Sequence, residues 1–314
     1  MPQPTGRRTL LGVAAGGLLA AGLPRPSLGA PLRRHEPFTF LFITDAHIQP
    51  ELDAAAGTAL CFDKAARIPA DFAIQGGDHV FDALGVARTR AIDLAGLYDR
   101  TEHRLGMRVH HAIGNHDLLG IYARSGVEPS DPLYGKKFFQ DRWGPLHYAF
   151  DYKGVHLVVL DSIGVTPDRD YQGLVDAEQV DWLRNDLDRL PAGTPVILVS
   201  HVPLVTAFPC YGDPNPKVAA AIPRHQISVA NAPDVLHLLR GHNVLGVLQG
   251  HTHVNETVWW QGIPFITGGA VSGNWWHGTH LGTPEGFTVV EVRDNRLLTR
   301  YETYGFRSVD PQNS

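Results

Sequence analysis

Sulfur-containing residues are scarce in this sequence: its 314 residues include only two cysteines and two methionines. Cys61 and Cys210 are far apart in the chain, and neither belongs to a Cys-x-x-Cys pair, so a metal site built from thiolates has little support. Their separation is compatible with one disulfide bond and equally with two free thiols. Any metal chemistry would therefore rest on nitrogen and oxygen ligands.

Clusters of positive charge are also missing beyond the N-terminal segment. The chain has 27 lysines and arginines against 32 aspartates and glutamates, a formal net charge of −5. Duplex nucleic acid is bound largely through clustered basic side chains, so we expect no duplex nucleic-acid partner. The hydrophobic fraction of 43% and the charged fraction of 19% are typical of a globular protein. Histidine stands out, with 17 copies, which hints at metal chemistry.

Long apolar runs are absent as well, apart from an export-type signal in the first thirty residues. Arg7-Arg8 precede an alanine-rich apolar stretch at 9–23, and a small-residue cleavage site ends at Ala30. The apolar run of about 14 residues is shorter than the roughly 20 that span a bilayer, which favours a cleaved signal over a membrane anchor. The paired arginines resemble a twin-arginine signal, which would make the twin-arginine export machinery a partner. We predict a signal peptide over 1–30, one domain over 36–306 without a transmembrane segment, and a periplasmic or secreted location.

Short apolar runs alternate with helix-like stretches along the rest of the chain. The runs predict strands buried on both faces, at residues 38–43, 72–74, 109–113, 196–199 and 244–248. The helix-like stretches are residues 54–68, 88–104, 176–190 and 231–240, with Asp176 as an N-cap of the third. This alternation predicts a layered α/β architecture.

Three further segments have recognisable local signals. Residues 147–161 predict a hairpin that turns at Lys153-Gly154, and residues 286–305 predict another that turns at Asp294-Asn295. The proline-rich segment 203–226 has little periodicity and predicts a long surface loop. Long loops in compact domains are often functional, so this segment is a candidate substrate-binding element.

A cluster of polar residues follows each of the five predicted strands. The clusters are Asp45-Ala46-His47, Gly77-Asp78, Gly114-Asn115-His116-Asp117, Ser200-His201 and Gly250-His251-Thr252-His253. One such cluster alone fits a structural role, but five in order favour a site, because α/β sheets place their sites at the carboxyl ends of strands. Imidazole together with carboxylate suits Zn, Fe, Ni or Mn ions rather than Ca or Mg.

Phosphate-ester hydrolysis is a reaction that such a ligand set would serve. The ester is negatively charged and repels a hydroxide nucleophile, and attack builds further charge on the phosphoryl oxygens. Two cations roughly 3.5–4 Å apart offset that charge, lower the pKa of a bound water and hold both the entering and the leaving oxygen. Holding both ions requires several nitrogen and oxygen ligands, with a carboxylate to bridge them.

The order of these clusters resembles the calcineurin-like metallophosphoesterase family. Its motifs are D-x-H, G-D, G-N-H-[DE], a lone histidine and G-H-x-H, and all five occur here between Asp45 and His253. The resemblance covers about two-thirds of the chain. It implies an α/β fold, a four-layer αββα sandwich of two mixed β-sheets flanked by helices. It also implies a binuclear metal site at the carboxyl ends of the strands.

Carried over position by position, the resemblance assigns roles to the clustered residues. A first divalent ion would be bound by Asp45, His47 and His253, and Asp78 would bridge the pair. A second would be bound by Asn115, His201 and His251. The two ions would be Mn, Fe, Zn or Ni. A hydroxide bridging them would attack phosphorus, and His116 would protonate the leaving oxygen as a general acid, supported by Asp117 or by Asp82.

Departures from two branches of the family narrow the expected activity. Purple acid phosphatases have glycine at the position of His47 and a tyrosine ligand at that of Phe81, which disfavours a tyrosinate–iron centre. The remaining pattern looks most like the phosphodiesterases of the cyclic-nucleotide and sphingomyelinase-like branch. Monoesterases often add cations for their extra charge, and few lysines or arginines lie near the motifs. We expect a phosphodiesterase acting on a small-molecule or lipid phosphate ester, with a phosphomonoesterase or a non-catalytic binding module as alternatives.

Two regions are candidates for substrate binding. The loop 203–226 contains Phe208 and Tyr211, and the adjacent Trp275 and Trp276 follow the last motif between glycines. The two tryptophans could form an aromatic shelf for a base or an apolar group. Because neighbours on a strand face opposite sides, at least one of them is expected to pack the domain instead. Trp259-Trp260 are expected to be structural.

Overall fold

The computed structural model describes residues 33–211 and 224–312. They belong to one compact unit that extends from Pro31 to Ser314. The predicted signal peptide lies outside the described residues, as does the middle of the predicted loop 203–226. No helix in the described part of the chain is both long and apolar enough to cross a membrane.

Strands and helices alternate along the described chain. The strands are β1 (Phe38–Ile43), β2 (Phe72–Gln75), β3 (Val109–His111), β4 (Tyr148–Tyr152), β5 (Val155–Leu160), β6 (Ile163–Val165), β7 (Tyr171–Gly173), β8 (Pro195–Ser200), β9 (Asn243–Gln249), β10 (Glu256–Trp260), β11 (Ile263–Thr267), β12 (Gly286–Arg293) and β13 (Arg296–Thr303). The α-helices are α1 (Ala54–Ala65), α2 (Arg88–Glu102), α3 (Lys137–Trp143), α4 (Ala177–Asp188), α6 (Arg224–Ile227) and α7 (Ala232–Leu238). Short 3₁₀ turns are η1 (His103–Leu105), η2 (Asn115–Asp117), η3 (Ala123–Ser125) and η4 (Phe208–Cys210).

The strands form two large mixed sheets and one small hairpin. The first sheet has the order β13-β12-β1-β2-β3, with β1, β2 and β3 parallel and β12 and β13 antiparallel. The second has the order β10-β11-β9-β8-β5-β4, with β5, β8, β9 and β11 parallel and antiparallel strands at both edges. Strands β6 and β7 pair with each other.

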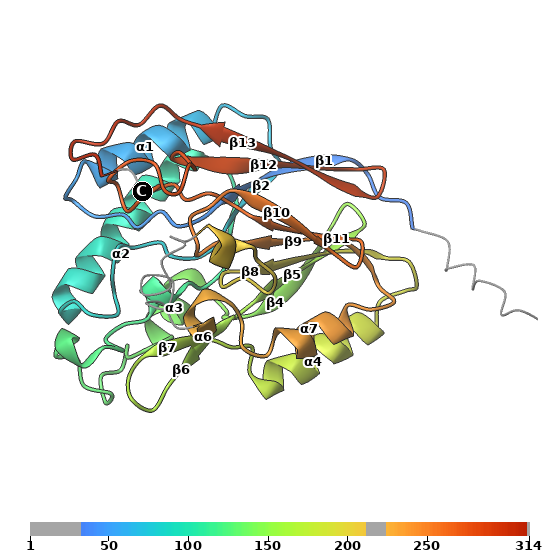
Figure 1. Ribbon diagram of the computed structural model, residues 1–314, viewed down its shortest axis with the longest axis horizontal. Coiled ribbons are helices and arrows are strands. Elements are labelled where there is room, and N and C mark those ends of the chain that lie inside the picture. Colours follow the sequence, from blue (N-terminus) through green and yellow to red (C-terminus); the bar gives the residue numbers. More distant parts are fainter. Residues whose placement is uncertain (1–32, 212–223, 313–314) are drawn as a thin grey trace, which may run out of the picture. The chain divides into compact units, whose positions relative to one another are not determined.

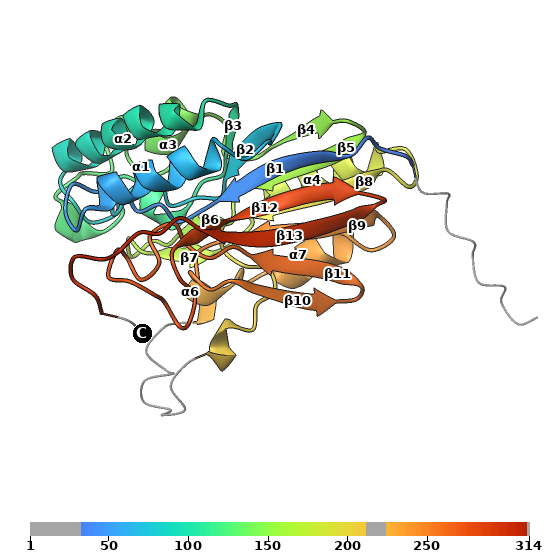
Figure 2. The same ribbon diagram turned by 90° about the horizontal axis from the view of Figure 1, so that it is seen from above.

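Three clusters of buried side chains hold the sheets and helices together. Because alternate side chains of a strand point to opposite faces of its sheet, one strand contributes to two of these clusters. On β1, Phe40 and Phe42 pack between the two sheets, whereas Leu41 and Ile43 face α1 and α2. Strand β5 likewise divides its side chains between the inter-sheet core and the layer under α4 and α7. The order of layers is helix, sheet, sheet, helix, with α1 on one side and α4 and α7 on the other (Figure 1; Figure 2). The predicted four-layer αββα sandwich of two mixed sheets is confirmed.

Local signals account for helix α4 and for the two predicted hairpins. Asp176 caps α4 by accepting a hydrogen bond from the Gln179 backbone N–H. The hairpins β4–β5 and β12–β13 turn at Lys153-Gly154 and Asp294-Asn295, all four with positive φ. Helix α3 and the β6–β7 hairpin were not predicted, because elements this short leave no clear periodicity.

The layered arrangement gathers strand ends at one place. Strands β1, β2 and β3 run parallel to one another, as do β8 and β9 in the other sheet. The loops that follow these strands therefore emerge at the same edge of each sheet. Each of these loops carries one of the five polar clusters. The fold therefore brings together motifs that are separated by up to 206 residues in sequence.

Candidate metal centre

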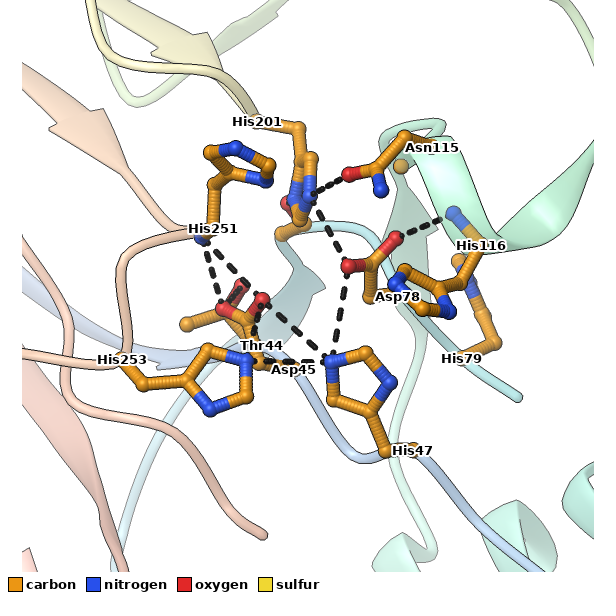
Figure 3. Close-up of polar contacts among 12 residues, drawn as sticks. Thr44, Asp45, His47, Asp78, His79, Asn115, His116, His201, His251 and His253 are labelled. Carbon is orange, nitrogen blue, oxygen red and sulfur yellow. Dashed lines mark hydrogen bonds and ion pairs between the residues drawn. The ribbon is translucent and has the colours of Figure 1, made fainter. Parts of the chain in front are cut away.

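The predicted ligands converge in one buried group at the carboxyl ends of the strands (Figure 3). Six of the seven are buried and His251 is half-buried. The group contains three overlapping sets of three residues. Within each set, the imidazole nitrogens and carboxylate oxygens lie within 4.8 Å of one another. The sets are Asp45-His47-His253, His47-Asp78-His116 and Asp78-His201-His251.

The first half of the group contains Asp45, His47 and His253. The Nε2 atoms of the two histidines are 3.0 Å apart. Asp45 Oδ1 lies 3.4 Å from Nε2 of His253 and 3.9 Å from Nε2 of His47. Three donor atoms from β1 and β9 loops thus face a common point.

Asp78 lies between the two halves (Figure 3). Its Oδ2 atom is 3.5 Å from Nε2 of His47 in the first half and 3.2 Å from Nε2 of His201 in the second. Its Oδ1 atom accepts a hydrogen bond from the His116 backbone N–H. This carboxylate is therefore placed where the predicted bridging ligand has to be.

The second half contains Asn115, His201 and His251. The Asn115 side-chain oxygen is 3.2 Å from Nε2 of His201. The His251 ring packs edge-on to the His201 ring, with centroids 5.2 Å apart. Imidazole nitrogens, carboxylates and an amide oxygen form a donor set that fits divalent transition-metal ions.

Main-chain carbonyls hold the ligand imidazoles by their outer nitrogens. Because a carbonyl oxygen can only accept, the nitrogen that faces it carries the proton and the other ring nitrogen keeps a lone pair for a metal. Nε2 is thereby left for the metal in three histidines, and Nδ1 in His251. The pairs are His47 Nδ1 with Phe81 (3.4 Å), His201 Nδ1 with Gly76 (2.8 Å), His253 Nδ1 with Gly273 (2.6 Å) and His251 Nε2 with Gln226 (2.6 Å).

Backbone strain occurs at most of the same residues. Side-chain-bearing residues rarely adopt positive φ, and each such residue costs about 1–3 kcal/mol that the surrounding structure must offset. Five of the seven predicted ligands have positive φ: Asp45 (56°), His47 (42°), Asp78 (56°), His251 (73°) and His253 (58°). These turns direct the side chains inward immediately after the strands end.

Motif glycines leave the space that this convergence needs. A Cβ at Gly114 would overlap the backbone nitrogen and Oδ1 of Asp78. A Cβ at Gly77, which has a φ of 107°, would overlap the His201 ring. Two glycines of the predicted motifs are therefore required by close approach of the bridging and second-half ligands.

The charges of the metal-free group stabilise one another. Burial alone would raise the pKa of Asp45, but the facing His253 and His201 outweigh it and lower that pKa to about 2. Burial would lower the pKa of His201, but Asp78 and Asp45 outweigh it and raise that pKa to about 9. Burial and then the nearby His201 lower the pKa of His251 to about 4. A proton on His201 thus balances part of the negative charge of Asp78 and Asp45.

Metal affinity should consequently depend on pH. Below pH 9 a proton on His201 competes with a metal for Nε2, so we expect the affinity of the second half to fall as pH falls, by up to about tenfold per pH unit. Calorimetric Mn²⁺ titration of the metal-free protein in buffers of different ionisation enthalpy measures both affinity and proton release. An affinity that stays constant over this range, with no released proton, would contradict the placement of His201.

His116 lies beside the group, but its support differs from the prediction. Its Nδ1 lies 2.5 Å from the main-chain oxygen of Phe81, which leaves Nε2 toward the pocket. Asp117 was expected to support this ring, and that expectation is wrong. Both Asp117 oxygens accept backbone N–H groups, from Gly114, Asp78 and His79. Asp117 therefore ties two motif loops together.

Asp82, the alternative support for His116, is also engaged elsewhere. It accepts a hydrogen bond from the Gly85 backbone N–H and lies 3.6 Å from Arg124. The support that sequence reasoning missed is the Phe81 carbonyl, which has no residue-type signature. Sequence reasoning also missed His79, which contacts Asp117 through Nδ1 (2.9 Å) and stacks on Trp143. The only available signal for His79 was its position directly after Asp78.

The two adjacent tryptophans have different roles. Trp275 is half-buried and its ring centroid lies 4.5 Å from that of His253, at the wall of the pocket. Trp276 is fully buried, which corrects its assignment to the substrate shelf. It packs into the space left by Gly57 of α1 and against Phe306, and its indole N–H donates to the His47 carbonyl. Trp276 thus supports the metal centre from behind.

A pocket of about 240 Å³ opens onto the metal centre. Its wall includes the predicted Phe208 but not Tyr211, which is exposed and stacks on Phe208. The wall also includes Gln226, the last residue of the predicted loop 203–226, and three residues that were not among the predicted site residues: Tyr171, Ile227 and His280. No lysine or arginine is among the wall residues whose side chains the structure describes.

Other predictions have simple outcomes. Cys61 is buried and Cys210 is exposed, and both are free thiols in the structure. Trp260 packs in the layer under α4 and α7, as expected, whereas Trp259 is 69% exposed on the edge strand β10. A second hollow of about 500 Å³, between residues 87–89 and 125–131, contains none of the predicted site residues.

Comparison with known proteins agrees with this geometry. Residues 38–255 match the sequence profile of the family described as calcineurin-like phosphoesterase. A Rhodococcus erythropolis protein described as a probable cyclic nucleotide phosphodiesterase is 34% identical over 174 residues, which is 55% of this chain. The match spans only 48% of that relative's length.

Solved structures share the fold at low sequence identity. A dimetal phosphatase from Danio rerio superposes with a TM-score of 0.61 at 17% identity, over 85% of this chain and 96% of that one. A purple acid phosphatase from yellow lupin (Lupinus luteus) seeds gives a TM-score of 0.51 at 13% identity, over 88% of this chain and 53% of that one.

Proposed function

The chain belongs to the calcineurin-like phosphoesterase family, and on this premise we propose that it is a phosphodiesterase that depends on two divalent metal ions. The observation that carries the proposal is the position of Asp78. Its Oδ2 atom lies 3.5 Å from His47 and 3.2 Å from His201, so one carboxylate faces both halves of the ligand group.

The chain's own residues supply the binding and orientation. Asp45, His47 and His253 would hold one ion, Asn115, His201 and His251 the other, and Asp78 both. When bound, the ions would polarise the phosphoryl oxygens and bring the pKa of a water near neutrality. The main-chain carbonyls fix the imidazoles before any ion arrives, so little reorganisation is needed.

His116 is suited to protonate the leaving oxygen. The Phe81 carbonyl fixes the proton of Nδ1, so in the imidazolium form Nε2 carries the proton that points into the pocket. The His116 ring lies edge-on to His47, with centroids 4.7 Å apart, which places it beside the ligand group. An acid at this position could serve the ester oxygen while the ligands hold the phosphoryl group.

The pocket wall favours a diester over a monoester. A phosphomonoester carries more negative charge than a diester, and the described wall offers no lysine or arginine to balance it. Instead it presents the rings of Tyr171, Phe208 and Trp275. Such rings suit a planar or apolar substituent on phosphorus, as in a nucleotide ester. The R. erythropolis relative, described as a probable cyclic nucleotide phosphodiesterase, is consistent with this class.

A panel of esters tests this function. With Mn²⁺ bound, we expect higher kcat/KM for cyclic nucleotides and other aromatic diesters than for the matching monoesters. Loss of stacking in Trp275→Ala should raise KM for nucleotide diesters by roughly 5- to 150-fold, the equivalent of about 1–3 kcal/mol, and spare dimethyl-type small diesters.

The exposed Trp259 provides the matched control, and Trp259→Ala should leave KM and kcat/KM unchanged. Faster turnover of monoesters than of diesters would contradict the proposed function. An equal KM increase for nucleotide and small diesters would contradict the stacking role of Trp275.

A further inference from the structure

His251, in the second half of the ligand group, is held by a residue outside the five motifs. His251 Nε2 lies 2.6 Å from the main-chain oxygen of Gln226, in the short helix α6. The carbonyls that face His47 and His201 come from the motif loops that follow β2. The orientation of His251 therefore depends on an element with its own anchoring.

The contact decides which nitrogen of His251 is free. Since the Gln226 oxygen can only accept, the Nε2 atom of His251 donates, and Nδ1 retains its lone pair. In Figure 3 the His251 ring lies beside His201, on the side of the group away from His47. If the carbonyl moved away, the ring could rotate or change tautomer, and Nδ1 would lose its fixed direction.

Helix α6 cannot hold this position by itself. It has four residues, from Arg224 to Ile227, and an isolated helix of one turn is unstable in water. The Gln226 side chain fastens it at one end, because its amide donates to Asp170 Oδ2 at 3.1 Å and to the Tyr171 carbonyl at 3.4 Å. Both acceptors lie at the start of β7, next to α6 in the fold (Figure 1). Just after the helix, the backbone N–H groups of Val229 and Ala230 donate to the carbonyls of Pro203 and Gly173.

We propose that Gln226 is a positioning residue for the second half of the metal centre. Its side chain fastens α6 to β7, and its main-chain carbonyl thereby fixes His251 with Nδ1 toward the other ligands. The inference rests on the proposed function, because it assumes that the second half holds a metal. Gln226 acts through His251 and needs no contact with substrate.

Side-chain variants of Gln226 remove the side-chain hydrogen bonds that fasten α6 and leave the main-chain carbonyl that faces His251 in the chain. Gln226→Met keeps the length but removes the donor, and Gln226→Glu places a carboxylate against Asp170. Gln226→Lys restores a donor that can pair with Asp170. The matched control is Gln172→Met, which changes the neighbouring half-buried glutamine of β7.

Calorimetric titration of the metal-free full-length proteins with Mn²⁺ alone gives a readout independent of activity. We expect wild type, Gln226→Lys and Gln172→Met to bind two ions with similar affinities. Gln226→Met and Gln226→Glu should weaken one of the two sites by about tenfold, the lower end of the effect of removing an outer hydrogen-bond partner of a ligand. The other site, which contains His47 and His253, should keep its affinity.

The remaining outcomes overturn the proposal in distinguishable ways. If wild type binds two ions and Gln226→Met does so with unchanged affinities, the positioning role is wrong and the proposed function stands. If Gln226→Met weakens both sites equally, Gln226 has a general structural role instead. If wild type itself binds fewer than two ions, the proposed function fails and this inference fails with it.

Discussion

Asp78→Asn is expected to remove bound metal and hydrolytic activity together. The Asp78 carboxylate is the group that faces both His47 and His201. Burial opposes ionisation of Asp78, but His201 and His116 outweigh burial and lower its pKa well below the usual range. It is therefore negatively charged at any working pH, and asparagine would remove that charge with little change in shape.

The loss should exceed the roughly 10- to 100-fold effect of changing an outer partner of a metal ligand, because a direct ligand of both ions is altered. Metal content by mass spectrometry and kcat/KM on a diester measure the two effects in the same preparation. Asp161→Asn is the matched control, since Asp161 is a buried carboxylate paired with Lys136 and lies outside the ligand group. Two bound ions and full turnover in Asp78→Asn would refute the bridging role.

His116→Ala should slow hydrolysis while the protein keeps its metal. Its Nδ1 faces the Phe81 carbonyl, so the ring is held for proton transfer and is not needed to hold an ion. A general acid contributes about 10²- to 10⁴-fold, and we expect a loss of kcat in that range for esters with poor leaving groups. Esters whose leaving group departs without a proton should be affected much less.

His116 is also near enough to His47 and Asp78 to bind a metal, so the experiment has two clear alternatives. Loss of metal in His116→Ala would make this residue a ligand and remove it as the acid. An equal rate loss for good and poor leaving groups, with metal retained, would also contradict proton transfer. His237→Ala, an exposed histidine on α7, should change neither quantity.

The fold was predictable where strands are long and buried. The runs that became β1, β8 and β9 are apolar along both faces because each packs against a sheet on one side and helices on the other. Helix α4 was predictable from its N-cap residue Asp176 and from the spacing of the apolar residues along the helix. Helix α3 and the three-residue strands β6 and β7 are held by tertiary packing, which leaves no local period to detect.

The convergence of these polar residues was predictable because their types suit metal binding and each cluster follows a buried strand, and the resemblance to the family added the role expected of each one. Their supports were not, because main-chain carbonyls such as those of Phe81 and Gln226 can come from any residue. The difference between Trp275 and Trp276 was equally hidden. Both have positive φ in a turn, so strand alternation does not apply to them. Space beside Gly57, far away in sequence, decides which of them is buried.

Anomalous X-ray scattering from crystals loaded with Mn²⁺ tests the central claim most directly. We expect two peaks separated by roughly 4 Å, as in two-metal phosphoesterase sites. One should lie beside Asp45 and His253, the other beside His201 and His251, with Asp78 in contact with both. A single peak, or two peaks that do not share Asp78, would contradict the two-ion account of this protein.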